Sequence, residues 1–344
     1  MRWLQTTNHL YRVSDLLQPC LLLLILFCQF ATAGAGIRVA VISDLNGSYG
    51  SAHYGPAVDD AISRIIGLKP DLVIITGDMV AGQRRPHLSR AGVERMWDAF
   101  HAHVSDPLQA AGIPLAVTPG NHDASAYAGF RLERRIFAEQ WLPRRPALHY
   151  LDDNRYPYHY AFSLDEILFI SLDATTSGQL PEAQMAWLHN LLEKHGPAHR
   201  RRVVFSHLPL WPLARGREHE FVGDPGLQAL LEASGVELYL SGHHHAFYPG
   251  ALDGVAFVGQ ACLGAGPRRL IGTEKPSSRG FTLLEFTSDA IEVSAYEAPG
   301  FHTATDWTAL PARIRTGTVE LHRADLATGV SVRPGSAATR EATH

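Results

Sequence analysis

Five apolar segments of the sequence are each followed directly by aspartate, asparagine or histidine, the residue types that bind divalent metal ions. The five groups are Asp44-Leu-Asn46-Gly47, Gly77-Asp78, Gly120-Asn-His-Asp123, Ser206-His207 and Gly242-His-His-His245. Carboxylate, amide oxygen and imidazole together suit manganese, iron or zinc, and the lack of thiolates argues against a structural zinc site. Glycine beside several of these residues lets the backbone turn sharply and approach closely. The pattern therefore predicts a metal site built from several loops.

The apolar segments themselves predict the scaffold that positions these groups. Residues 37–43, 71–76 and 113–118 have the pattern of buried strands, and residues 57–66 and about 91–110 have helical spacing. This alternation is typical of stacked βαβ units. Strands at 202–206 and 236–240, with helices at 181–193 and 227–233, continue it. Because ligands in α/β sheets lie outside the carboxyl ends of strands, we expect the five groups to share one cleft.

After Gly242 the pattern changes to strands without helices. Residues 255–258, 281–286 and 291–296 predict an antiparallel sheet, and the strand pair at 158–161 and 167–172 precedes them. The sequence thus predicts the α/β class, with the strands arranged as an α+β sandwich. The last stretch, about 323–344, is polar and rich in small residues, so we expect a frayed tail there.

Composition narrows the function classes. The 344 residues include 30 Lys+Arg and 34 Asp+Glu, giving a formal net charge of −4, with 46% apolar residues. This is ordinary for a globular protein and excludes disorder as a description of the whole chain. The basic footprint of a nucleic-acid-binding protein is absent, so we predict no nucleic-acid partner. No amphipathic insertion helix is evident either, which disfavours a membrane-lipid substrate.

Residues 1–33 have the pattern of a secretory signal peptide. Arg2 and Arg12 precede an apolar run of about 11 residues, which Ala31-Thr-Ala33 follows as a small-x-small cleavage site. We expect cleavage after Ala33, export to the periplasm or the extracellular space, and no stable membrane insertion after cleavage. The alternatives are an uncleaved anchor or a wrongly assigned start codon. The mature chain would keep one cysteine, Cys262, and so no internal disulfide.

Taken in order, the five groups resemble the motifs of the calcineurin-like metallophosphoesterase family. The resemblance runs from Ile37 to about Glu297, and the segments Tyr158–Asp173 and Gln184-x-x-Trp187-Leu188 support it. It implies a four-layer fold with two central mixed β-sheets flanked by helices. It also implies one phosphoesterase domain over residues 34–310, which leaves 311–344 as a C-terminal extension whose end is flexible.

The resemblance assigns roles around two divalent metal ions, which would be manganese, iron or zinc. Asp78 would bridge both ions. Asp44 and His245 would bind the first ion, and the second would be bound by Asn121, His207 and His243. A metal-bridging hydroxide would then attack phosphorus. His122 would assist the leaving group as general acid or transition-state stabiliser, and Asp123 would orient it.

One position departs from the family pattern, because Asn46 stands where the family usually has histidine. Its amide oxygen either binds the first metal or hydrogen-bonds a bound water, which leaves that site's affinity and metal preference open. His53, a few residues further on, either compensates for Asn46 as a ligand or is a surface loop residue, and we favour the surface interpretation. His244 lies between two predicted ligands. If that segment is extended, its side chain points away from theirs, towards substrate or solvent.

The predicted function is an exported, metal-dependent phosphoesterase that hydrolyses phosphomonoester or phosphodiester bonds of a small soluble phosphate ester. The alternative is a catalytically weakened relative that binds metal and acts as a binding module for phosphate ligands. Asn46 favours that alternative, whereas the intact His122-Asp123 pair favours the enzyme. The purple acid phosphatase variant is unsupported, because no tyrosine follows Asp78 in Met-Val-Ala-Gly82. Oligomeric state is left open.

Overall fold

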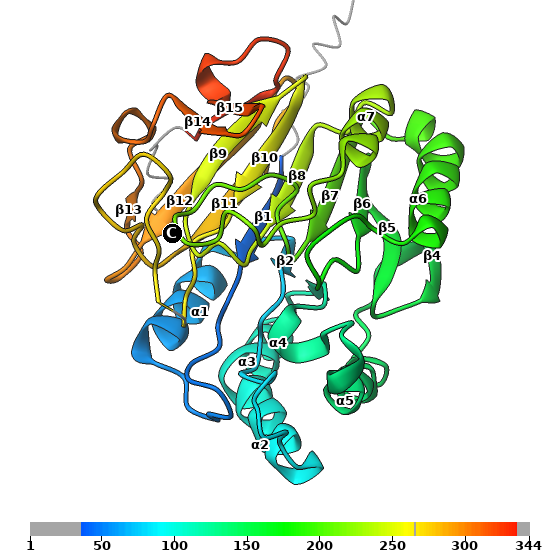
Figure 1. Cartoon of the computed structure of the whole chain (residues 1–344), viewed down its shortest axis with the longest axis vertical. Helices are drawn as coiled ribbons and strands as arrows, with labels where there is room; N and C mark the ends of the chain where they lie inside the picture. Colours follow the sequence, from blue (N-terminus) through cyan, green and yellow to red (C-terminus); the bar gives the residue numbers. More distant parts are fainter. Residues whose placement is uncertain (1–35, 265, 336–344) are drawn as a thin grey trace, which may run out of the picture. The chain divides into compact units, whose positions relative to one another are not determined.

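The computed structural model describes residues 36–264 and 266–335, so the predicted signal peptide lies outside the described residues. Two mixed β-sheets dominate this part of the chain (Figure 1). The first sheet has the order β13-β12-β11-β1-β2-β3, with β16 beside β12. The second has the order β14-β15-β9-β10-β8-β7-β6-β5-β4. The predicted fold class, with two central mixed sheets, is confirmed.

The strands of the first sheet are β1 (Ile37–Ile42), β2 (Leu72–Ile75), β3 (Leu115–Val117), β11 (Gly280–Phe286), β12 (Ile291–Glu297), β13 (Thr303–Ala304) and β16 (Val332–Pro334). The strands of the second are β4 (His149–Arg155), β5 (His159–Leu164), β6 (Ile167–Ser171), β7 (Arg201–Ser206), β8 (Leu238–Ser241), β9 (Tyr248–Leu252), β10 (Val255–Gly259), β14 (Arg313–Thr316) and β15 (Val319–Arg323). The neighbours β1, β2 and β3 are parallel, as are β6, β7, β8 and β10. Each parallel set therefore brings its carboxyl ends to one edge of its sheet.

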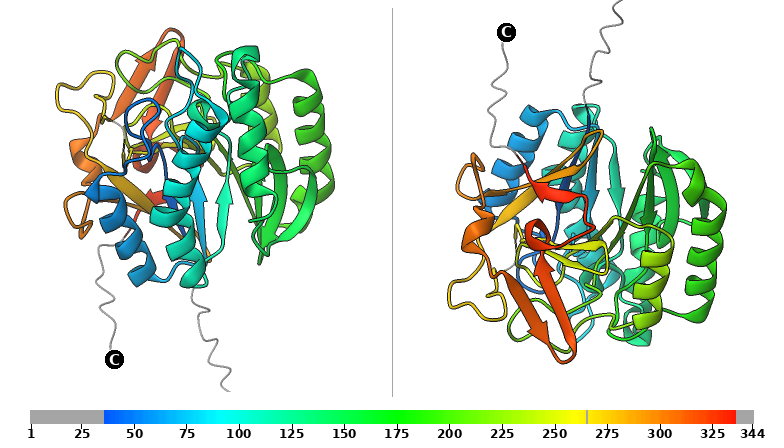
Figure 2. Two further views of the ribbon diagram at one scale, coloured as in Figure 1. Left: turned by 90° about the horizontal axis from the view of Figure 1, so that it is seen from below. Right: turned by 90° about the horizontal axis from the view of Figure 1, so that it is seen from above.

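Helices cover the outer faces, which makes four layers (Figure 2). They are α1 (Pro56–Leu68), α2 (Arg90–Phe100), α3 (Asp106–Ala110), α4 (Asn121–Ala124), α5 (Arg131–Trp141), α6 (Glu182–His195) and α7 (Pro225–Ala233). Leu188 of α6 and Leu231 of α7 belong to one buried cluster with Ile170 and Val204 of the second sheet. The larger cluster joins Val58 of α1 to both sheets. Burial of these apolar faces holds the layers together.

The predicted helix over 91–110 is confirmed with an irregularity. It consists of α2, a π-helical turn at His101–Ser105, and α3, whose Pro107 lies in its first turn. Proline has no N–H to donate and its ring crowds the carbonyl of the preceding turn, which a local change of helical pitch accommodates. Within the described residues, no helix is both long and apolar enough to cross a membrane.

The C-terminal residues depart from expectation. The strand β15 pairs with β9, and β16 pairs with β12, so residues after 310 extend both sheets instead of forming a separate extension. The predicted frayed tail from Arg323 onward is wrong as far as residue 335. Arg323 is only 6% exposed, and its Nη1 donates to the carbonyl oxygens of Trp307 and Leu310. Its Nε and Nη2 atoms donate to the carboxylate of Asp325, so this buried guanidinium is a structural anchor.

Candidate metal centre

The loops after the central strands are joined to one another by backbone hydrogen bonds. Asp44 N donates to Gly77 O (3.2 Å), which links the ends of β1 and β2. Gly242 N donates to His207 O (2.9 Å), which links the ends of β7 and β8. Leu263 N donates to Ser43 O (3.2 Å) and adds the segment after β10. The loops that carry the predicted motifs therefore lie together, as expected from the sequence.

Close approach of these loops depends on glycine. A Cβ atom on Gly120 would lie 2.1 Å from Asp78 N and 2.2 Å from Asp78 Oδ1. One on Gly242 would lie 2.1 Å from Ser43 Oγ. Separations below 3 Å are not tolerated, so only glycine fits at both positions.

Four of the predicted ligands have a left-handed backbone, which is uncommon for residues other than glycine. The φ angles are 50° for Asp44, 56° for Asp78, 62° for His243 and 50° for His245. Such conformations cost free energy and persist where the surroundings enforce them, which is frequent at functional sites. The sharp turns direct these side chains inward at the strand ends.

The residues predicted for the second metal converge on one point. His207 Nε2 lies 2.8 Å from Asn121 Oδ1, 3.3 Å from Asp78 Oδ2 and 3.2 Å from His243 Nδ1. The ligand atoms of Asp78, His207 and His243 all lie within 4.8 Å of one another. The Nδ2 group of Asn121 donates to Gln83 Oε1 (2.8 Å), which leaves the Oδ1 atom of Asn121 facing His207. These four groups fit a divalent cation.

Of the residues predicted for the first metal, Asp44 and His245 are in direct contact. Asp44 Oδ2 accepts from Ser43 Oγ (2.6 Å) and from His243 N (3.0 Å), so Oδ1 is directed inward, 3.1 Å from His245 Nε2. Asn46 is 5% exposed, and its Oδ1 atom has no hydrogen-bond partner among the described residues. A buried oxygen without a donor is costly unless a cation or another group satisfies it, so this set also fits a metal.

Each predicted ligand histidine is fixed by an acceptor on the nitrogen that faces away from the centre. His207 Nδ1 lies 2.8 Å from Thr76 O, and His245 Nδ1 lies 3.0 Å from Gly266 O. His243 Nε2 lies 2.8 Å from Glu220 Oε2. Carbonyl and carboxylate oxygens accept only, so each outer nitrogen carries the proton and the inner nitrogen is the ligand atom. Metal-binding histidines in proteins are held in this way.

Electrostatics keeps a proton where a cation would bind. Burial lowers the pKa of His207, but the negative charge of Asp78 outweighs burial and raises the pKa to about 9. Burial likewise raises the pKa of Asp78, and the positive charges of His207 and His122 reverse this, so that the pKa is lowered. A cation that binds between these residues replaces this proton.

His122 lies at the partly open face of the centre. Its Nε2 atom is 3.7 Å from Asp78 Oδ2, its Nδ1 atom is 3.1 Å from Gly82 O, and its side chain is 18% exposed. The ring of Tyr49, 58% exposed, packs at 5.0 Å between centroids. This position suits a side chain that donates a proton to the leaving group of a substrate bound from the solvent side.

Asp123 does not orient His122, which corrects the prediction. Asp123 is fully buried, and its two oxygens accept from Met79 N (3.0 Å) and Gly120 N (3.0 Å). It ties the loop after β2 to the loop after β3. The carbonyl of Gly82 is the partner of His122 instead. Asp123 is thus a positioning residue and not a catalytic one.

His244 faces neither substrate nor solvent, which corrects the second expectation. It is fully buried, and its Nδ1 atom accepts from Leu213 N (3.2 Å) and Ala214 N (3.3 Å). Its Nε2 atom donates to the carbonyl oxygen of Glu220 (2.9 Å). Burial lowers the pKa of His244 to about 3, so the ring is neutral. Sequence reasoning missed Glu220 and Gln83, since nothing in their spacing marks them.

Comparison with known proteins agrees with this class of site. The model of the calcineurin-like phosphoesterase family matches residues 37–247. The chain belongs to the calcineurin-like phosphoesterase family, and the predicted membership in that family is confirmed. The enzyme class named in the prediction, metallophosphoesterase, is the class of this family.

Individual relatives are distant. Serine/threonine-protein phosphatase CPPED1 of Danio rerio is 26% identical over 209 residues, which span 57% of this chain and 60% of that protein. A dimetal phosphatase structure from Danio rerio superposes with a TM-score of 0.56 at 17% identity, covering 76% of this chain and 96% of that one. A purple acid phosphatase structure from yellow lupin (Lupinus luteus) superposes with a TM-score of 0.55 at 17% identity, covering 76% of this chain and 51% of that one. The two structures show the fold.

Proposed function

We propose that this chain is a metal-dependent phosphoesterase that hydrolyses mono- or diesters of phosphate with two divalent cations. One observation carries the proposal. Three histidines, His207 after β7 and His243 and His245 after β8, are each anchored on the outer nitrogen and turn the inner nitrogen towards the Asp78 group or Asp44. A scaffold without bound cations has no use for this arrangement. Manganese, iron and zinc all suit these ligands.

Cations held there supply Lewis acidity, which lowers the pKa of a water molecule and neutralises charge on phosphoryl oxygens. The chain supplies everything else. Asp78, with Asn121, His207 and His243, would hold one cation, and Asp44, with Asn46 and His245, would hold the other; in this proposal the Asp78 carboxylate serves both. His122, with Nδ1 held by Gly82 O, places Nε2 where it donates a proton to the leaving oxygen.

The substrate proposed is a small soluble phosphate ester. Export after cleavage behind Ala33 stays a prediction from the N-terminal pattern alone, and N-terminal sequencing of protein secreted from cells would test it. A chain that keeps residues 1–33 would contradict cleavage.

The function is tested by hydrolysis of matched chromogenic monoester and diester substrates by the manganese-loaded protein, with Asp78→Asn as the blank. We expect turnover that Asp78→Asn abolishes. His122→Ala should slow esters with poor leaving groups by roughly 100-fold or more, and activated phenolate esters much less. A protein that binds manganese, iron and zinc but hydrolyses neither substrate would overturn the enzyme in favour of the binding module.

A further inference from the structure

We propose that Glu220 is a positioning residue of the metal centre, which holds His243 in the tautomer and orientation that bind the second cation. The inference rests on the proposed function, because it concerns the same metal site. Glu220 lies in the loop between β7 and α7, residues 208–224, here called the 208–224 loop. Among the predicted ligands, only His207 adjoins this loop in the sequence.

The first support is the contact between the two side chains. Glu220 Oε2 lies 2.8 Å from His243 Nε2, while His243 Nδ1 lies inside the centre, 3.2 Å from His207 Nε2. A carboxylate has no proton to offer, so His243 must donate from Nε2 and present a lone pair at Nδ1. Carboxylate–histidine–metal arrangements of this kind fix the ring and raise its basicity.

The second support is that Glu220 is itself held in place. Its carbonyl oxygen accepts from His244 Nε2 (2.9 Å), its N–H donates to Arg217 O (3.0 Å), and its Oε1 atom is paired with Arg217 Nη1. Two consecutive residues of the strand-end motif therefore hold Glu220: the ring of His243 contacts its carboxylate, and the ring of His244 contacts its backbone carbonyl. A surface glutamate with no role beyond solubility needs none of these contacts.

The third support is a contrast among the three histidines. The outer nitrogens of His207 and His245 lie against backbone carbonyls, of Thr76 and Gly266. The partner of His243 is a side chain, and it is charged. A substitution at position 220 therefore removes the partner of His243 without altering the backbone, whereas the partners of His207 and His245 cannot be removed in this way.

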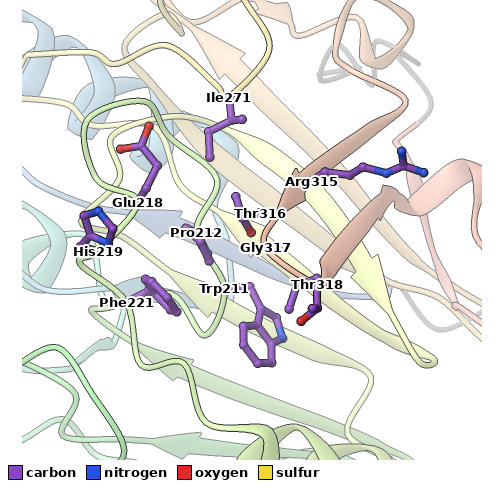
Figure 3. Close-up of a pocket in the computed structure, with 11 residues that line it drawn as sticks. Trp211, Pro212, Glu218, His219, Phe221, Ile271, Arg315, Thr316, Gly317 and Thr318 are labelled. Carbon is purple, nitrogen blue, oxygen red and sulfur yellow. The ribbon is translucent and has the colours of Figure 1, made fainter.

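A neighbour in the same loop provides a matched control. Glu218, His219 and Phe221 line a cavity of about 520 Å³ between the 208–224 loop and the β14–β15 hairpin (Figure 3). Figure 3 shows the side chain of Glu218 at this cavity, beside His219. Glu218→Gln removes the same charge from the same loop, at a side chain that lines the cavity instead of pairing with His243.

The experiment is calorimetric titration of the metal-stripped full chain with Mn²⁺, comparing wild type with Glu220→Gln, Glu220→Leu and Glu218→Gln. We expect wild type to bind two ions. Glu220→Leu should weaken one of the two sites by 10- to 100-fold and leave the other unchanged, since loss of such partners has effects of roughly that size. Glu220→Gln keeps an acceptor without the charge and should fall between. Glu218→Gln should match wild type.

A metal-free measurement separates positioning from general damage. The ¹⁵N shifts of the His243 ring in stripped wild type should report the Nε2–H tautomer, and Glu220→Leu should lose that preference. Wild-type affinities together with an unchanged tautomer in Glu220→Leu would overturn the inference. Two bound ions without ester hydrolysis would sink only the proposed function, whereas a wild type that binds no cation would sink both.

Discussion

The amide oxygen of Asn46 shows how one residue sets the properties of the centre. It is buried, two residues after Asp44, and has no hydrogen-bond partner among the described residues. Leaving a buried acceptor unpaired costs about 1–3 kcal/mol. The residue is therefore unfavourable in the metal-free chain and favourable when a cation accepts its lone pair.

This gives a prediction with opposite signs under two conditions. In chelator, Asn46→Leu should raise the free energy of unfolding, by roughly 1 kcal/mol, because it removes the unpaired oxygen at similar volume. With Mn²⁺ present, the same variant should bind the first ion more weakly, by about tenfold or more. Urea denaturation and metal titration measure the two effects. Stability that falls in chelator and an unchanged manganese affinity would together show that Asn46 does not face the site.

At the residue scale, the ligand types were predictable from sequence but the partners were not. Asp123 follows His122 directly, but both lie on the short helix α4, where successive side chains point about 100° apart. His244 was placed by the alternation of an extended strand, but its neighbours have φ near 62° and 50°, so the alternation does not apply. Adjacency in sequence misled in both cases because the local backbone differs.

At the scale of elements, the centre depends on how closely strand ends pack. Gly120→Ala should destabilise the protein by several kcal/mol and abolish tight metal binding, because its Cβ would overlap the backbone and Oδ1 of Asp78. Gly67→Ala in helix α1 is the matched control, since its Cβ meets nothing within 4 Å. That variant should be neutral or more stable by up to about 1 kcal/mol. Thermal denaturation and manganese titration of both variants check this; equal effects would contradict it.

The contact between the 208–224 loop and the end of β8 should make stability depend on pH. The pKa of His244 is about 3 in the folded chain and about 6.5 when unfolded, so the unfolded state binds more protons between these values. Its contribution is fully present above pH 6.5 and is lost as pH falls towards 3, by at most about 1.4 kcal/mol per pH unit.

His244→Gln keeps a donor and an acceptor without titrating. In chelator, urea denaturation from pH 7 to 4.5 should therefore show a shallower loss of stability for His244→Gln than for wild type. The exposed His53→Gln should retain the wild-type slope. Identical slopes for wild type and His244→Gln would show that His244 is not buried neutral.

Central elements were predicted well because they bury continuous apolar runs. The prediction of 71–76 corresponds to β2, every residue of which is buried. By contrast β4, with the sequence His-Tyr-Leu-Asp-Asp-Asn-Arg, is mostly half-exposed and carries no apolar run. Its pairing with β5 forms the edge of the second sheet, where solvent replaces a neighbouring strand. Such an edge strand is specified by its partner more than by its own sequence.

At the scale of the whole molecule, the last described residues complete both sheets. The strands β15 and β16 lie far along the chain but pair with β9 and β12. Each contributes only a few ladder pairs, and β16 has the sequence Val-Arg-Pro with one buried residue. Long-range pairing of such short segments leaves no periodic signal, which is why the sequence indicated a tail there.

Metal removal tests how far the centre holds the molecule together, since it joins loops from both sheets. A ligand that binds only the folded state stabilises it by about 4.1 kcal/mol at 1,000 times its Kd. With an unfolding entropy of about 2 cal/mol/K per residue over about 300 residues, that amounts to roughly 6–8 °C in Tm. We therefore expect a chelator to lower the Tm of manganese-loaded protein by an amount in this range. Asp78→Asn, which loses the carboxylate that lies with His207 and His243, should respond much less. An equal Tm with and without manganese, iron and zinc would mean that the strand ends are held by their backbone contacts and glycine packing alone, and that the convergent histidines do not bind these ions.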